Sequence, residues 1–180
     1  MPEPNLPGGP TQDEIMAVSL FKLDLCPTDT VLEIGCGTGK VSVAMAKLAK
    51  RIYAVDRRPE SITVATETAR QADISNIGFS CMDALDFLKK DQVFDCAFLG
   101  GTKNLAEILP VLAKKVRRTI VINAVMVSTL ERAVATLKDL GIFAEVVQVQ
   151  VSRSYDIAGS IMFRPIDPVY IIVARGAACS

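Results

Sequence analysis

The sequence contains no histidine and no tryptophan, and its charges cancel. Without histidine, the chain cannot use a histidine general base, a Ser-His or Cys-His nucleophile pair, or a histidine metal ligand. The 20 lysines and arginines balance the 20 aspartates and glutamates, so no overall charge attracts nucleic acid. No apolar run approaches the roughly 20 residues that cross a bilayer. We therefore expect no nucleic-acid partner and no membrane partner.

Cysteine is present in a pattern that excludes two common uses. The five cysteines are scattered, and no two of them form a C-x-x-C pair. This arrangement argues against a disulfide framework and against a zinc site, so we expect no bound metal. The first residues, MPEPN, have neither the charge nor the apolar core of a signal peptide. The protein is therefore expected to be cytoplasmic.

The order of sequence patterns predicts a single domain over residues 1–180. Residues 1–10 are rich in proline and glycine and form an irregular N-terminal segment, after which a capping box at 11–14 begins a helix that Pro27 stops. Short apolar segments then alternate with helical patterns, which is typical of βαβ units and a parallel sheet. The expected strands are 30–34, 51–55, 77–81, 94–99 and 118–123, and the expected helices are 39–49, 59–71, 84–88, 105–115 and 128–140.

The last forty residues follow a different pattern. Residues 143–151 and 169–174 are two further strand patterns, and the polar residues 152–168 between them show no helical pattern, so we expect a loop there. Strands joined without a crossover helix run antiparallel. The prediction is an α/β fold with a mostly parallel seven-stranded sheet, helices on both faces and an antiparallel C-terminal hairpin.

A glycine-rich loop directly after the first strand is the strongest local signal. Residues 31–39 read VLEIGCGTG, with glycines at Gly35, Gly37 and Gly39 and a helical pattern following. Glycine allows a sharp turn and a close approach of the backbone to a ligand. Dinucleotide-binding folds use G-x-G-x-x-G, and a P-loop needs a Ser or Thr after its lysine, whereas Val41 follows Lys40 here.

The spacing G-x-G-x-G, preceded by Glu33, is instead similar to the first motif of S-adenosylmethionine-dependent methyltransferases of class I, which have a Rossmann-like fold. In that family the glycine loop bends around the methionine and ribose parts of the cofactor. The resemblance implies that S-adenosyl-L-methionine is the cofactor. It also implies that Cys36 and Thr38, between the glycines, belong to the cofactor site together with Glu33.

Two further carboxylates follow the second and third strands. Asp56 ends the segment YAVD, where a carboxylate can accept hydrogen bonds from both ribose hydroxyls, and its alternative role is to cap the next helix. Asp83 and Ala84 follow the third strand, where the family places an acidic residue and its neighbour beside the adenine. Capping of a helix by Asp83 is an almost equally good interpretation and is compatible with ligand contact.

The fourth strand ends in Gly100-Gly101-Thr102. Methyltransferases that act on nitrogen often carry Asn/Asp-Pro-Pro-Tyr/Phe at this place. Two glycines leave room for a bulky substrate and supply no side chain that orients it, so alignment would be the protein's main contribution. A purely structural turn would favour two glycines equally well.

Together these residues make the chain resemble the decarboxylating cobalt-precorrin methyltransferases of cobalamin biosynthesis. The segments that carry the resemblance are PGGPT at 7–11, EIGCGTG at 33–39, LGGT at 99–102, and the stretch from 151 to 169. The resemblance implies methylation of carbon 15 of a corrinoid ring and loss of the carboxyl group from the acetate on carbon 12. It implies that Thr11, the 35–39 loop, Asp56 and Ala84 contact S-adenosylmethionine. It also implies a homotetramer whose late hairpin helps to form the subunit contacts.

A tetrapyrrole with several carboxylates would need cations and room. Arg153, Arg164 and Lys103 are the candidates to receive the carboxylates, and Gly100 and Gly101 are candidates to face the ring. Arg153 and Tyr155 are weak candidates to polarise the acetate that loses carbon dioxide, and Thr102 is a third weak catalytic candidate. Any cobalt would arrive within the substrate.

Two other functions are compatible with the same sequence. One is a methyltransferase that acts on another small molecule or on RNA, although the neutral charge and few aromatic residues disfavour RNA. The other is a cofactor-binding partner protein without catalysis, which would also preserve the glycine loop and Asp56.

Overall fold

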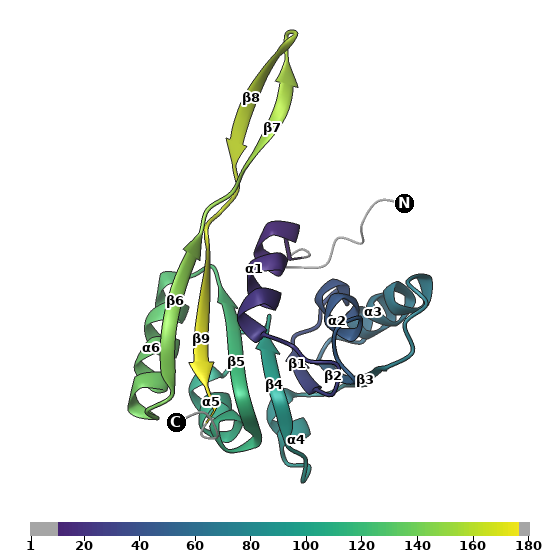
Figure 1. The fold of residues 1–180 in the computed structure, drawn as a ribbon, viewed down its shortest axis with the longest axis vertical. Helices are drawn as coiled ribbons and strands as arrows, with labels where there is room; N and C mark the ends of the chain where they lie inside the picture. The colour runs from purple at the N-terminus through teal and green to yellow at the C-terminus, as the bar shows by residue number, and fades with distance from the viewer. Residues whose placement is uncertain (1–10, 177–180) are drawn as a thin grey trace.

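Seven strands form the central sheet, in the order β3-β2-β1-β4-β5-β9-β6 (Figure 1). The structure is a computed structural model, and it describes residues 11–176. The strands of this sheet are β1 (Thr30–Ile34), β2 (Arg51–Asp56), β3 (Ile77–Cys81), β4 (Phe94–Leu99), β5 (Val116–Ala124), β6 (Phe143–Val149) and β9 (Val169–Arg175).

The sheet is parallel except for one strand. The pairs β1–β2, β1–β4, β2–β3 and β4–β5 are all parallel. Strand β9 lies between β5 and β6 and runs antiparallel to both. The mostly parallel sheet with an antiparallel end is therefore confirmed. Because the first five strands are parallel, their carboxyl ends meet along one edge of the sheet.

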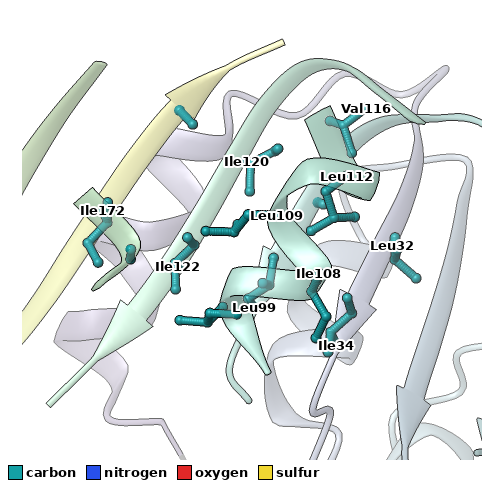
Figure 2. Packing of buried hydrophobic residues seen from close by; sticks show 14 of the residues in the cluster. Leu32, Ile34, Leu99, Ile108, Leu109, Leu112, Val116, Ile120, Ile122 and Ile172 are labelled. Atoms are coloured by element: carbon teal, nitrogen blue, oxygen red, sulfur yellow. The ribbon is translucent and has the colours of Figure 1, made fainter. Parts of the chain in front are cut away.

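Helices cover both faces of the sheet, as predicted. Their bounds are α1 (Asp13–Leu23), α2 (Lys40–Ala46), α3 (Pro59–Gln71), α4 (Ala84–Leu88), α5 (Leu105–Lys115) and α6 (Val127–Asp139). Neighbouring residues of a strand point to opposite faces, so Val31 packs in the cluster with α1, α2 and α3, whereas Leu32 packs in the cluster with α4, α5 and α6. Figure 2 shows the second cluster, which includes Leu109 and Leu112 of α5 and Ile120 of β5.

The local signals at helix ends were correct in part. Pro59 stands in the first turn of α3, where its missing N–H group costs nothing. The capping box predicted at 11–14 is wrong, because Gln12 is the N-cap of α1 and makes no capping hydrogen bond through its side chain. Helix α1 also ends at Leu23, before Pro27, since Asp24 adopts a left-handed conformation with φ of 52°.

The loop expected at 152–168 is wrong, because most of it forms two further strands. Strands β7 (Ser152–Ile157) and β8 (Ser160–Pro165) pair antiparallel in a separate two-stranded sheet. This hairpin projects from the ends of β6 and β9, far beyond the central sheet (Figure 1). The polar composition of residues 152–165 therefore gave no sign in the sequence of the hairpin that they form. No helix within residues 11–176 is long and apolar enough to cross a membrane.

Candidate functional site

Two adjoining cavities open at the carboxyl ends of the parallel strands. The smaller has a volume of about 260 Å³ and lies over β1, β2 and the segment that follows β3. The larger has a volume of about 420 Å³ and extends from the glycine loop past the end of β5 to the start of β9. Gly35, Arg58 and Thr102 line both cavities, so they mark the boundary between them. The predicted Thr11 lines the larger cavity.

The glycine loop turns only because three of its residues adopt left-handed conformations. Gly35, Gly37 and Gly39 have φ values of 79°, 52° and 78°. A Cβ atom on Gly35 would lie 2.5 Å from the backbone nitrogen of Gly101, and one on Gly39 would lie 2.8 Å from Ala65 of α3. A Cβ on Gly37 would meet nothing within 4 Å. Two glycines therefore serve close packing, and Gly37 is the one that faces open space.

The contact with Gly101 explains the paired glycines after β4. The backbone N–H groups of Gly100 and Gly101 both donate to the carbonyl of Ile34, at 3.0 Å each. A Cβ on Gly100 would lie 3.0 Å from the carbonyl oxygen of Gly35. The loops after β1 and β4 thus touch backbone to backbone, which supports the structural interpretation of this pair. Gly100 also lines the larger cavity, and Gly101 and Lys103 line the smaller one.

Asp56 lies at the end of β2 as a buried carboxylate with several donors. Its side chain accepts hydrogen bonds from the Gly37 N–H at 3.1 Å, and from the Arg58 N–H, Nε and guanidinium nitrogen at 3.0 Å each. Burial raises the pKa of Asp56, but the hydrogen bonds and charge of Arg58 outweigh it and hold the pKa below its usual value. Asp56 does not cap α3, because the N-cap residue of that helix is Arg58.

Asp83 caps a helix, as one interpretation of the sequence predicted, and it also lines the smaller cavity. It is the N-cap of α4, and its carboxylate accepts a hydrogen bond from the Leu85 N–H at 2.9 Å. Asp83 and Ala84 both line the smaller cavity beside Met82 and Ile108. Capping therefore coexists with access to the cavity, and two apolar side chains lie nearby.

Glu33 is almost fully buried at the edge of the larger cavity. It is 1% exposed and accepts a short hydrogen bond from the hydroxyl of Ser42. Burial raises the pKa of Glu33 to about 8, the bond from Ser42 lowers it only in part, and the charge of Asp56 raises it further. Burial also raises the pKa of the Cys36 thiol, which argues against a reactive thiolate there.

Three predicted residues lie outside both cavities in a single chain. Arg153 and Tyr155 are in β7 and Arg164 is in β8, so all three belong to the projecting hairpin. The Arg164 guanidinium lies 4.9 Å from the ring centroid of Tyr155, and Arg153 pairs with Glu14 of α1. The structure gathers these residues at one end of the molecule but does not bring them into the cavities of the same chain.

Sequence reasoning missed several residues of the larger cavity. Lys40, Asn123, Val125 and Met126 line it, together with Asp167. The Nδ2 atom of Asn123 is buried and has no hydrogen-bond partner among the described residues. Position alone could have found Asn123, since it ends a parallel strand at the same edge as Asp56. Within residues 11–176, no cluster of His, Cys, Asp or Glu side chains is placed to hold a metal ion.

The fold and the two cavities define a methyltransferase domain. A family model described as "Methyltransferase domain" matches residues 27–159. A protein of Methanosarcina mazei, named "Probable cobalt-precorrin-6B C(15)-methyltransferase (decarboxylating)", is 44% identical over 173 residues, which are 93% of this chain and 94% of the relative. The same name is given to a protein of Methanosarcina acetivorans with 44% identity over 176 residues, 95% of this chain and 96% of the relative. The chain belongs to this family of decarboxylating cobalt-precorrin-6B methyltransferases.

Solved structures show the same architecture. The precorrin 8w decarboxylase of Methanobacterium thermoautotrophicum is 28% identical with a TM-score of 0.89, covering 92% of this chain and 91% of that chain. The precorrin-6y C5,15-methyltransferase of Geobacter metallireducens is 30% identical with a TM-score of 0.89, covering 96% of this chain and 94% of that chain. The predicted fold class and family resemblance are therefore confirmed.

Proposed function

We propose that this chain methylates carbon 15 of a precorrin, with or without cobalt, and promotes loss of the carboxyl group from the acetate on carbon 12. In this proposal S-adenosyl-L-methionine is the methyl donor, and the pathway is cobalamin biosynthesis. The relatives named above support the reaction. The observation that carries it is the pair of adjoining cavities that share Gly35, Arg58 and Thr102.

The residues of the smaller cavity fit a nucleoside. Asp56 lines this cavity, and ribose hydroxyls would share its carboxylate with the donors of Gly37 and Arg58. Val55, Met82 and Ile108 offer apolar surface to a purine ring. The adjoining glycine loop has open space at Gly37 for the rest of the donor. When bound, S-adenosylmethionine supplies a methyl group on a positively charged sulfur. Asp83 and Ala84 would lie beside the adenine.

Beyond the glycine loop, which would hold part of the donor, the larger cavity suits the acceptor molecule. Its rim includes the exposed apolar side chains of Val125 and Met126, which can cover part of a flat ring. Gly35, Arg58 and Thr102 would hold the two molecules in line across their shared boundary, and alignment is the main contribution the chain makes to transfer. No histidine base is present, and an electron-rich bridging carbon needs none. The electron pair left behind when carbon dioxide departs neutralises the positive charge that the incoming methyl brings to the ring.

We further propose a homotetramer in which the β7–β8 hairpins form subunit contacts. Ile161 and Phe163 of the hairpin are 65% and 68% exposed, an apolar surface that a partner subunit would cover. Such an assembly could bring Arg164 and Tyr155 toward a neighbouring site, as their predicted substrate roles require. The chain would act as one domain, in the cytoplasm, on a small molecule.

Incubation with S-adenosylmethionine and cobalt-precorrin-6B tests the reaction. We expect mass spectrometry to show a product that has gained a methyl group and lost carbon dioxide. Methyl transfer without loss of carbon dioxide would contradict the decarboxylating part of the proposal. No transfer by folded protein that binds S-adenosylmethionine would contradict all of it.

A further inference from the structure

Two ion pairs join three elements beside the larger cavity, and one of them, Lys40 with Asp13, includes a residue that lines it. Lys40, the first residue of α2, lines this cavity, and its Nζ lies 2.9 Å from Oδ1 of Asp13. Arg153 of β7 donates to both carboxylate oxygens of Glu14, at 3.3 and 2.7 Å. Asp13 and Glu14 are the first two residues of α1, and the residues on either side of them line the cavity. Two cations from different elements are thus held by adjacent acids of α1; Lys40 lines the cavity and Arg153 lies beside it.

The acids of these two pairs are much more exposed than the acid of another ion pair at the cavity, Arg58 with Asp56. Arg58 also lines the cavity, but its partner Asp56 has a side chain only 4% exposed, so separating them would leave a buried charge. The side chains of Asp13 and Glu14 are 71% and 44% exposed. Water competes for such exposed pairs, which are weak. Lys40 and Arg153 can therefore exchange partners at little cost, whereas Arg58 cannot.

The four charges at the rim act on one another. The hydrogen bond and charge of Lys40 lower the pKa of Asp13, and the charge of Arg153 lowers it further. The pKa of Glu14 is lowered first by its hydrogen bond from Arg153. The two cations and two acids therefore form a balanced group, in which the acids neutralise the rim. A ligand must bring two carboxylates to replace both acids.

We propose that Lys40 and Arg153 are the carboxylate-binding residues of the acceptor site, and that Asp13 and Glu14 hold them until a polycarboxylate ligand takes their place. This inference rests on the proposed function and names how that site recognises its substrate. The acids make the site selective, because a ligand with a single carboxylate replaces only one of the two ion pairs. Asp13 and Glu14 are therefore specificity-determining residues that do not touch the reacting atoms.

Binding of uroporphyrin, a tetrapyrrole with a carboxylate on every side chain, tests the exchange without turnover. We expect Asp13→Asn with Glu14→Gln to tighten binding roughly threefold, because the cations lose their internal partners, and Lys40→Gln or Arg153→Gln to weaken it about tenfold. Coproporphyrin, which has fewer carboxylates, should bind more weakly and respond less to each change. The matched controls are Asp91→Asn and Lys47→Gln, which remove exposed charges away from the rim.

Whether the double variant of Asp13 and Glu14 binds uroporphyrin more tightly or more loosely distinguishes an exchange of partners from a purely structural role of the two acids. A folding defect can weaken binding but cannot tighten it, so looser binding by the double variant would overturn the proposal. The proposal also fails if Lys40→Gln weakens binding of S-adenosylmethionine and leaves uroporphyrin unaffected. With the natural acceptor, the KM of each variant should follow its uroporphyrin affinity. A wild-type protein that binds uroporphyrin as described but transfers no methyl group would overturn the proposed function and leave the exchange standing.

Discussion

At the scale of single residues, two buried carboxyl groups near the cavities have opposite protonation states at neutral pH. Asp56 keeps a lowered pKa because Arg58 and the Gly37 N–H donate to it. Among the described residues, Glu33, one strand away, receives a hydrogen bond only from the Ser42 hydroxyl, and burial raises its pKa to about 8. The number and charge of the donors, rather than burial alone, therefore decide which carboxylate is ionised at neutral pH. Asp56 suits binding of hydroxyl donors, and Glu33 remains neutral beneath the glycine loop.

Replacement of Asp56 by alanine should weaken binding of S-adenosylmethionine by about 1–3 kcal/mol, through loss of charge-assisted hydrogen bonds. Calorimetric titration measures this change. Asp56→Asn, which keeps the size and removes the charge, should fall between the alanine variant and wild type. An unchanged dissociation constant in a folded Asp56→Ala protein would rule out the ribose role.

The raised pKa of Glu33 predicts how stability depends on pH. The folded protein keeps a proton on Glu33 up to a pH of about 8, whereas the unfolded chain loses it near 4.5. Its contribution to stability is therefore full below pH 4.5 and is lost as pH rises to about 8. Glu33→Gln removes this dependence, so its melting temperature relative to wild type should be higher at pH 9 than at pH 5. Equal differences at the two pH values would show that Glu33 ionises normally.

At the scale of elements, the site depends on two loops that touch without side chains. The loop after β1 and the loop after β4 approach so closely that Gly35 and Gly101 leave no space for a Cβ atom between them. Two N–H groups of the second loop bind the carbonyl of Ile34 at the end of β1. This contact fixes the relative position of the cavity walls, because both loops line both cavities.

Alanine at Gly35 and at Gly37 should therefore have different costs. The Cβ of Gly37→Ala meets no atom, so only the strain of its left-handed backbone lowers the free energy of unfolding, by about 1–2 kcal/mol. Gly35→Ala has the same backbone strain and must also move the Gly101 backbone. We therefore expect its free energy of unfolding to fall by roughly 3 kcal/mol or more. Urea denaturation of the two variants measures the difference. Equal losses would mean that the loops separate at little cost.

At the scale of the whole molecule, the β7–β8 hairpin is the feature that a single chain does not explain. It extends well away from the sheet and exposes Ile157, Ile161, Met162 and Phe163 (Figure 1). Such apolar surface on an extended arm is typical of subunit contacts. Within the described residues, its main link back to the body is the pair between Arg153 and Glu14.

Serine at both Ile161 and Phe163 should reduce the proposed homotetramer to smaller species without unfolding the central sheet. The reason is that both side chains are exposed within one chain and contribute to no core cluster. Sedimentation velocity measures the assembly, and thermal unfolding checks the fold. Val93→Ser, an exposed apolar change on a distant loop, is the control and should leave the assembly intact. A double variant of unchanged mass would exclude the hairpin from the subunit contacts.

Much of the architecture could be predicted because it depends on local patterns. The five parallel strands and their helices lie close to the predicted bounds, since alternation of apolar strands with amphipathic helices reflects burial on both faces of a sheet. The hairpin at 152–165 was not predicted, because its two strands are exposed and carry no pattern imposed by a core. The capping box failed because α1 begins one residue later than the motif requires, with Gln12 rather than Thr11 at the N-cap.

The sequence alone determined the glycine loop and the two carboxylates after β2 and β3, because each depends on residues close together in the chain. It also determined the family, through four segments spread along the chain. Only the tertiary structure decided which charges of different elements meet. Lys40 meets Asp13, and Arg153 reaches Glu14 across 139 positions of sequence. Ion pairs between distant elements depend on how those elements pack, and no short segment of sequence contains that information.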